Sequence, residues 1–278
     1  MKDPVAAIKQ LEKKVKAKAA ERQMVAHIVQ LPFWKDDKRS IPNELVRSAL
    51  FNVRNHKAKR QDFKEKLIAV LGDGRITYTG EELRQDDEDI WLQIMHLARM
   101  KPLGEWVDFT PYSFLKAISW PTTKYYYNKL QTRLSRMQAT ALTVYSKRLK
   151  RGVSVSLIRK FEWEDGLGKK LDRWRIWVEP EMKLLFGDVY FTQLEWKQRQ
   201  QLGPIAQWLH GIYASHAQPY ALKVETIWRT CGSDTKELRF FRPKLRKALE
   251  ELKKVGFLQE AWIDSNDLVH VNRIKNSS

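Results

Sequence analysis

Helices are the elements that the hydrophobic pattern predicts most clearly in the first half of the chain. Apolar side chains such as Ile90 and Ile94 recur at helical spacing over residues 81–100, and acidic residues crowd the first turns, where the helix dipole favours them. A second helix is predicted over residues 111–118, because proline stands at its first position and the threonine before it can cap it. A third helix is predicted over residues 124–138.

Strands are predicted after these helices. Residues 141–145 and 153–163 alternate or carry β-branched side chains, so we expect a hairpin whose tip is the basic stretch 147–152. Residues 173–178 supply another alternating strand. Helices followed by a hairpin with a basic tip are typical of a winged helix, a variant of the helix-turn-helix.

A similar order returns in the second half, as a repeat of pattern rather than of residues. Helices are predicted over residues 191–202, 204–215, 224–231 and 236–254, and a hairpin over residues 257–271. We therefore expect an α+β fold with two tandem winged-helix domains, at residues 41–186 and 187–278. In this interpretation residues 1–40 are a basic N-terminal arm and linker.

Composition adds a strongly basic character. The 278 residues include 51 Lys and Arg against 33 Asp and Glu, a formal net charge of +18, which suits nucleic acid, ribosomal or acidic-membrane ligands or a merely solubilising surface. Basic residues beside aromatics on helical stretches favour nucleic acid. The single cysteine, Cys231, excludes an intramolecular disulfide and a multi-cysteine zinc site. With neither an apolar run of about 20 residues nor a signal-peptide core at the start, we expect a cytoplasmic protein that does not enter a membrane.

The basic helix of the second half is the first candidate for DNA recognition. Its leucines predict a buried stripe that leaves most of its cations outward, and such a helix after a turn can lie in a major groove. The alternative is a solvated helix without a ligand. Pro243 is awkward inside a helix, so either the helix kinks there or its regular part begins at Arg242. The candidate DNA-binding residues are Lys236, Arg239, Arg242, Lys244 and Arg246.

The third helix of the first half is the matching element. At least one residue of Tyr125–Tyr127 has to face the core, since three consecutive positions span most of a helix circumference. The basic hairpin tip is predicted to bind phosphates, with a solvated turn as the alternative. The candidate DNA-binding residues are Lys124, Tyr125, Lys129, Arg133 and Arg136 in the helix, and Lys147, Arg148, Lys150 and Arg151 in the tip.

Arrangements that carry catalysis are missing from the sequence, so we expect a binding protein without catalytic residues, metal or cofactor. The six histidines never stand in a metal-binding pair, and the stretch Gly166–Lys169 is too short to cradle a nucleotide. Two minor alternatives remain. The acidic run Asp86–Asp89 would need consecutive side chains to converge on a metal, and a nucleophile among Tyr125–Tyr127 would lack visible support.

The segment Gln30–Trp34 is a candidate docking peptide. Pro32 favours an extended backbone, which leaves Leu31, Phe33 and Trp34 as apolar anchors. Adjacent exposed aromatics are costly, so they either pack on the first domain or dock in a partner's groove, and physical reasoning alone favours packing.

Several stretches of the sequence are similar to one known family. The most specific is Ile76–Arg84, which reads Ile-Thr-Tyr-Thr-Gly-Glu-Glu-Leu-Arg. The others are residues 41–43, 47–51, 134–141, 225–226, 231–234 and 267–270. Through these stretches the chain resembles, over roughly residues 30–273, the TrfA family, the replication initiators of broad-host-range IncP plasmids.

The resemblance implies a protein that binds direct repeats (iterons) of double-stranded origin DNA as a monomer and helps to melt an adjacent AT-rich region. The melted single strand is a further candidate partner. The implied host partners are DnaA, the replicative helicase and the polymerase sliding clamp, while inactive dimers and coupling of repeat-bound molecules limit plasmid copy number.

The family's clamp-binding pentapeptide falls at Gln30, Leu31, Phe33 and Trp34, so clamp binding becomes the favoured role of this segment. The alternative function is a winged-helix transcriptional repressor, which would have no use for such a peptide.

Overall fold

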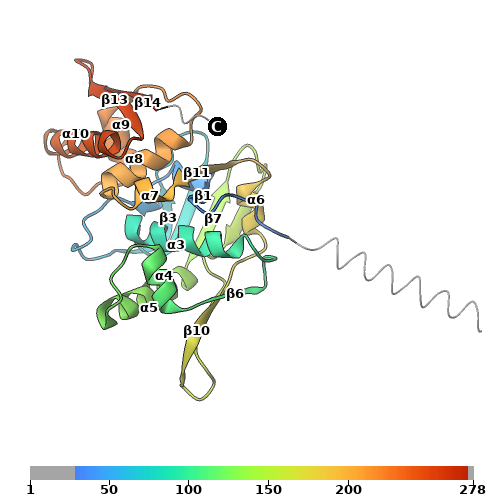
Figure 1. The fold of residues 1–278 in the computed structure, drawn as a ribbon. Coiled ribbons are helices and arrows are strands. Elements are labelled where there is room, and N and C mark those ends of the chain that lie inside the picture. Colours follow the sequence, from blue (N-terminus) through green and yellow to red (C-terminus); the bar gives the residue numbers. More distant parts are fainter. Residues whose placement is uncertain (1–28, 275–278) are drawn as a thin grey trace, which may run out of the picture.

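The computed structural model describes residues 29–274, which fold into two units stacked on one another (Figure 1). Buried apolar side chains form one cluster over residues 31–196 and a second that lies mainly in residues 202–269. We call residues 29–199 the first unit and residues 200–274 the second unit. Among the described residues, no helix combines the length and the apolar character needed to span a membrane.

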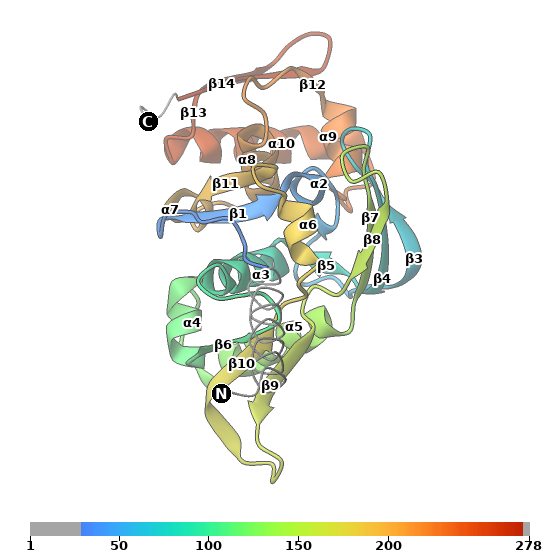
Figure 2. The same cartoon turned by 90° about the vertical axis from the view of Figure 1, so that its right-hand side faces the viewer.

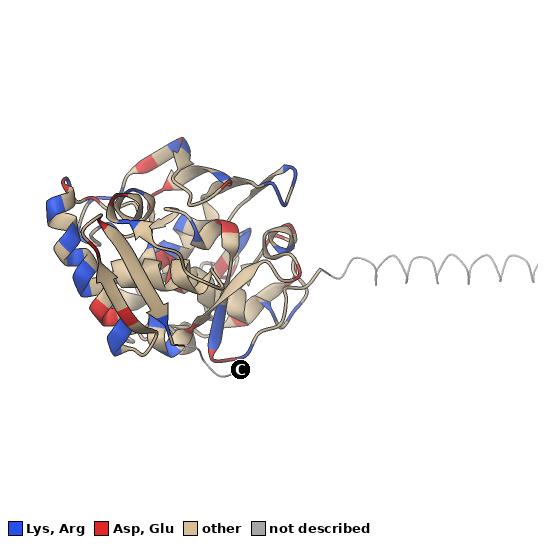
Figure 3. Cartoon of the chain, turned by 90° about the horizontal axis from the view of Figure 1, so that it is seen from above, with Lys and Arg blue, Asp and Glu red and all other residues tan. Residues whose placement is uncertain are grey.

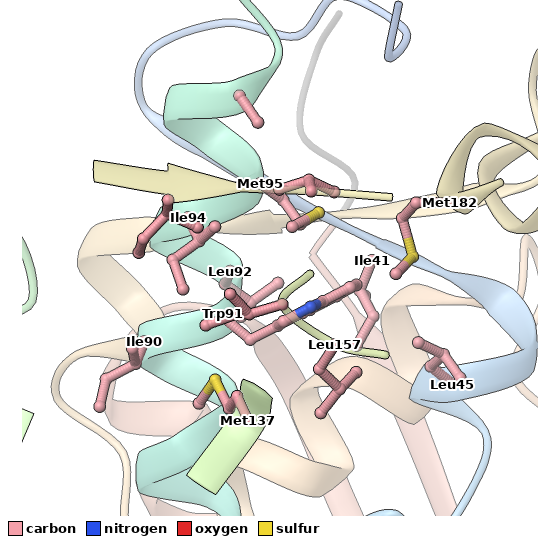
Figure 4. Close-up of a cluster of buried hydrophobic side chains, with 14 of the residues drawn as sticks. Ile41, Leu45, Ile90, Trp91, Leu92, Ile94, Met95, Met137, Leu157 and Met182 are labelled. Carbon is pink, nitrogen blue, oxygen red and sulfur yellow. The ribbon is translucent and has the colours of Figure 1, made fainter. Parts of the chain in front are cut away.

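Helix α3 (Gln85–Ala98) is the centre of the first unit. Its Trp91 is fully buried and lies among apolar side chains from several other elements (Figure 4). The helix begins at Gln85 because the Asp87 carboxylate accepts a hydrogen bond from the backbone N–H of Arg84 at 2.8 Å, which caps the N-terminus. The predicted start at residue 81 is therefore too early.

Helices α4 (Pro111–Ala117) and α5 (Lys124–Gln138) confirm the predicted second and third helices. The hydroxyl of Thr110 accepts a hydrogen bond from the backbone N–H of Ser113 at 3.1 Å, so the predicted cap is present. On α5 the buried side chains include Leu134, which lies at helical spacing from the other apolar residues of that face.

A three-stranded antiparallel sheet belongs to these helices. It is built in the order β6-β10-β9 from β6 (Trp106–Phe109), β10 (Lys170–Trp177) and β9 (Lys160–Glu164). Strand β6 lies between α3 and α4 in the chain, and β9 and β10 form a hairpin. Figures 1 and 2 show this hairpin extending away from the body of the protein, with residues 165–169 as its tip.

A separate four-stranded sheet contains the basic tip predicted from the sequence. Its strands, in order, are β3 (Asp62–Ile68), β4 (Arg75–Glu81), β7 (Ala141–Tyr145) and β8 (Gly152–Val155). The single strand predicted over residues 153–163 is wrong, because β8 ends at Val155 and β9 begins in the other sheet. Buried Leu157 and Ile158 lie between the two strands. The predicted tip therefore closes the β7–β8 hairpin and not the β9–β10 hairpin.

One long-range strand pair closes the first unit. Strand β1 (Lys38–Pro42) pairs antiparallel with β11 (Phe191–Glu195). The helix predicted over residues 191–202 is wrong, since alternate side chains of β11, such as Leu194, are buried and suit a strand. Only Trp196–Arg199 forms a helix, α7.

Because of this strand pair, the boundaries between the units differ from the domain boundaries expected from the sequence. Residues 191–195 pair with β1, and Trp34 is buried in the first cluster, so the breaks expected after residues 40 and 186 both lie inside the first unit. The short elements that complete this unit are α2 (Asn43–Val46), β2 (Phe51–Asn52), β5 (Leu83–Arg84) and α6 (Met182–Phe186).

The second unit repeats the order of the first. Its elements are α8 (Pro204–Ala214), β12 (Leu222–Lys223), α9 (Val224–Thr230), α10 (Leu238–Lys254), β13 (Leu258–Ile263) and β14 (Leu268–Arg273). The sheet order β12-β14-β13 matches β6-β10-β9, with the strand between the first two helices at one edge and the last strand in the centre. The part of the first unit made of α3, β6, α4, α5, β9 and β10 thus has the connectivity of the whole second unit, with β7 and β8 inserted between α5 and β9, inside a mixed α/β fold.

Candidate nucleic-acid interface

Helix α10 presents a cationic surface. Its Leu245, Leu249 and Leu252 are buried in the second cluster, as the leucine spacing predicted. In Figure 3, segments of Lys and Arg recur along the helix at the left edge, which is α10 in Figure 1. Of the five residues predicted to bind DNA here, Arg242 is half-buried. The other four are exposed: Lys236, Arg239, Lys244 and Arg246.

Two of these arginines have carboxylate partners within the chain. Arg239 lies 2.9 Å from Glu237 in an exposed ion pair, which restrains the arginine only weakly. Arg242 donates hydrogen bonds of 2.9 and 2.6 Å to the two carboxylate oxygens of Asp267, and these bonds hold the pKa of Asp267 below its ordinary value. Arg242 therefore ties α10 to the turn of the β13–β14 hairpin.

Pro243 lies inside α10, on its exposed side. The helix begins at Leu238, so the alternative that its regular part starts at Arg242 is wrong. Proline has no N–H to offer to the carbonyl one turn earlier. The neighbouring Lys244 Nζ donates to Thr235 Oγ1 at 2.9 Å, which fastens this turn of the helix to the loop before it.

The first turn of α5 exposes an aromatic and cationic end. Lys124 is exposed, and the Tyr125 ring is 68% exposed with its edge against Tyr126, at 5.1 Å between centroids. Lys129 Nζ lies 4.2 Å from the centre of the Trp120 ring, a cation–π contact at the same end of the helix. Lys124 and Tyr125 are thus exposed at this end of the helix, whereas Lys129 is half-buried and also lies 3.7 Å from Asp86.

Arg133 and Arg136 point the other way, toward the core. Arg133 lies 2.5 Å from Asp86 and 3.1 Å from Asp87, and Arg136 lies 2.7 Å from Glu81. Burial, with Asp86 beside it, raises the pKa of Asp87 to about 6, although the surrounding arginines oppose the shift. Both arginines therefore hold α5 against the acidic first turn of α3 and are not displayed to a ligand in this structure.

The predicted tip Lys147–Arg151 is only partly available. Arg148 lies 2.9 Å from Glu44, and its guanidinium sits 4.6 Å from the ring centre of Tyr190. Lys147 pairs with Asp73 at 2.7 Å in an exposed contact. Lys150 and Arg151 are exposed and remain accessible to a ligand.

The projecting β9–β10 hairpin was not predicted from the sequence. It stands where the expected fold requires a hairpin with a basic tip in the first unit, and it corresponds to the β13–β14 hairpin of the second unit. Its turn exposes Leu167 to 95% and continues into Lys169 and Lys170, both exposed. The signal was present as the turn residues Gly166 and Gly168, of which the second has φ +77° and so favours glycine. In the sequence these glycines stand out only as a stretch too short for a nucleotide cradle, so the turn of the hairpin was not predicted.

The segment Gln30–Trp34 packs on the first unit, which is the first of the two alternatives considered for it, the other being docking in a partner's groove. Leu31 is 4% and Trp34 2% exposed. The Trp34 ring stacks on Phe186 at 5.8 Å with an 8° tilt, and its Nε1 donates to His96 Nδ1 at 3.2 Å. Burial, reinforced by nearby arginines, lowers the pKa of His96 to about 3, so the imidazole is neutral and can accept this hydrogen bond.

The neighbouring residues of the segment differ in exposure. Gln30 donates to the backbone carbonyl of Arg99 at 2.9 Å, while Phe33 is 71% exposed. Of the three apolar anchors predicted for a partner's groove, Phe33 alone is displayed, because Leu31 and Trp34 fill the core.

A fully buried arginine joins the two units. Arg199 lies 2.7 Å from Asp89 and 3.4 Å from Glu88, and it donates to the Gln85 side chain at 3.1 Å. Burial raises the pKa of Glu88 to about 6, against the pull of Arg199. The backbone carbonyl of Gln207 on α8 also accepts from this guanidinium, so one side chain links α3, α7 and α8.

The acidic residues Asp86–Asp89 of α3 therefore all form ion pairs with arginines. Within residues 29–274, no three side chains of His, Cys, Asp or Glu are grouped so as to hold a metal ion.

Two solved structures share this fold. A crystal structure of domains 2–3 of RctB matches with a TM-score of 0.53 over 78% of this chain and 92% of that chain, at 10% identity. A selenomethionine derivative of domains 2 and 3 of RctB matches with a TM-score of 0.54 over 83% of this chain and 96% of that one, also at 10% identity. The class that the fold defines is thus a mixed α/β protein with the architecture of these two RctB domains.

The family follows from sequence comparison. The TrfA protein family model matches residues 2–273. A plasmid replication initiator protein TrfA from Escherichia coli is 37% identical over 254 residues, which are 91% of this chain and 66% of that protein, slightly under two thirds of its length. The chain belongs to the TrfA family, as the motif at Ile76–Arg84 led us to expect.

Proposed function

We propose that this protein initiates plasmid replication by binding direct repeats at the origin through two tandem winged helices. The observation that carries the proposal is the connectivity common to the two units, in which the third helix of the shared pattern, α5 or α10, has a cationic exposed end or face. A basic helix held before a hairpin is the arrangement that winged helices insert into a major groove. The relative from Escherichia coli, named as a plasmid replication initiator, supports the biological setting.

In this proposal α10 reads bases and α5 supports it. Lys236, Arg239, Lys244 and Arg246 face solvent on or just before α10 and offer donors for guanine and for phosphate. Lys124, Tyr125 and Lys129 contact the same duplex from the first unit. The exposed lysines of the β9–β10 turn take the phosphate-binding role that the sequence assigned to residues 147–151.

We further propose that repeat binding promotes melting of a neighbouring AT-rich segment and recruits host DnaA, helicase and sliding clamp, without enzymatic activity of its own. Self-association into an inactive dimer would limit initiation. In this proposal the sliding clamp contacts Phe33 and the exposed residues around it. Leu31 and Trp34 are buried, so they would have to leave the core before they could dock.

Footprinting on the origin of its own replicon, followed by permanganate probing of the AT-rich segment, tests the proposal. We expect regular protection of the direct repeats and reactive thymines beside them. Protection confined to a promoter, with repression and without reactive thymines, would establish the alternative of a transcriptional repressor.

A further inference from the structure

The outer face of the β6-β10-β9 sheet carries two tryptophans side by side. Strand register places Trp106 of β6 opposite Trp177 of β10, and Trp177 opposite Lys160 of β9. The two indole centroids are 6.2 Å apart with a 52° tilt, and the Trp106 side chain is 49% exposed. Together they form an aromatic surface across two adjacent strands.

The inner face of the same sheet is already occupied. The next positions along the strands, Val107, Ile176 and Phe161, are buried in the first cluster. Beyond them Phe109 packs against Phe114 of α4, with ring centroids 4.7 Å apart. The helices therefore cover one face, and the tryptophan row lies on the other, because side chains alternate along a strand.

Cations surround the tryptophan row. Lys160 Nζ lies 4.6 Å from the ring centre of Trp177, and the Arg175 guanidinium lies 5.8 Å from that of Trp106. The carboxylates of this face are engaged: Glu162 lies 2.5 Å from Lys160, and Asp108 pairs with Arg173 and with Lys101 at 3.5 Å. Exposed Glu164, two positions beyond Glu162 on β9, adds a third acid, and Lys170 opposite it adds a fifth cation, so the face stays net positive.

We infer that this face is a stacking site for single-stranded DNA. Unpaired bases stack on aromatic side chains, and neighbouring Lys and Arg hold the phosphates. A duplex keeps its base faces stacked inside, so it has no use for an exposed indole such as Trp106 beside the half-buried Trp177. Because α5 lies across the sheet from the tryptophans, one molecule can hold duplex on α5 and a single strand on the outer face.

The inference rests on the proposed function, since a melted origin supplies the single strand. It adds the place where that strand is held. The tryptophan row is not an extension of the buried core, because the Trp106 ring remains half exposed where a core residue would be covered.

The test compares the full-length protein with Trp106→Ala/Trp177→Ala and with Trp106→Phe/Trp177→Phe. Fluorescence anisotropy would measure binding to an oligothymidylate of about 15 nucleotides, within the site sizes usual for such grooves. We expect affinity to fall by about tenfold or more in the Ala variant, because each stacked base contributes on this order, and to be largely retained in the Phe variant. Duplex repeat binding should stay at the parent level in both.

A charge arm uses matched lysines. Lys160→Ala should weaken oligothymidylate binding and lower the slope of its salt dependence by about 0.7, the value for one phosphate that is no longer neutralised. Lys64→Ala, which removes an exposed lysine from β3 in the other sheet, should change neither.

Other outcomes overturn the inference or the proposed function separately. If both tryptophan variants bind the oligonucleotide as the parent does, the inference is wrong, and loss of helicase capture in the same variants would make the face a protein-docking surface. If the parent fails to bind duplex repeats, the proposed function falls whatever the oligonucleotide result. If the Ala variant unfolds, oligothymidylate binding by Lys160→Ala and by the Phe variant still tests the inference.

Discussion

Replacing Trp34 by Ala should lower the free energy of unfolding by about 3–5 kcal/mol, the range for removing a large aromatic side chain from a packed core. Trp34 is 2% exposed, stacks on Phe186, and lies 6.1 Å from the ring centre of Phe191. The change also removes the hydrogen bond from its indole to His96, which leaves a buried imidazole nitrogen without its donor. Both effects act in the same direction.

Urea unfolding followed by circular dichroism measures the change, and the neighbouring residue gives the control. Phe33 is 71% exposed, so Phe33→Ala should alter stability by no more than about 0.5 kcal/mol, as is usual for surface positions. The reasoning is refuted if Trp34→Ala is as stable as Phe33→Ala.

A pull-down with the host sliding clamp on the same two variants then separates folding from partner binding. If clamp capture uses the segment as it is packed in this structure, Phe33→Ala should reduce capture while leaving the fold intact. Capture that is unaffected by Phe33→Ala but disappears together with the fold in Trp34→Ala would place the contact elsewhere on the molecule.

Three further changes test the interface, the junction and the pH response. Arg239→Ala with Arg246→Ala should weaken repeat binding by about 1–3 kcal/mol for each arginine that reads a base, and equal affinity in a binding titration would exclude α10 as the reader. Arg199→Ala leaves the buried Glu88 and the partly buried Asp89 without their arginine and should destabilise the fold by about 3–5 kcal/mol, whereas Lys197→Ala, at an exposed position, should not. Burial lowers the pKa of His210 to about 3, so its unfolded-state protonation should cost about 2 kcal/mol of stability between pH 7 and 5. His210→Phe should remove that loss in urea titrations at the two pH values.

Helical periodicity explains why so much of the two units was predictable. The bounds of α5 and the cap at Thr110 are local features, and the leucine stripe of α10 depends only on spacing within one helix. Each of these signals is contained in a few turns of sequence, so no distant partner is needed to interpret it.

Features that depend on distant partners were not predictable. Whether Phe191–Glu195 is a strand depends on β1, and its short apolar run is equally compatible with a helix. Arg133 and Arg136 differ from true surface cations only because the acidic turn of α3 lies opposite them. Trp34 is a core residue because Phe186, far along the chain, completes its pocket.

The β1–β11 pair has a consequence for how the protein is made. Lys38 and Glu195 are 157 positions apart in the chain, so the ribosome delivers the second strand about 8–30 s after the first at ordinary elongation rates. During that interval the hydrophobic residues around Trp34 and Ile41 have no partner strand and are open to chaperones or to neighbouring nascent chains. Translation speed over residues 43–190 thus becomes a determinant of yield, and synonymous codons that slow elongation there should increase the fraction of newly made protein that aggregates.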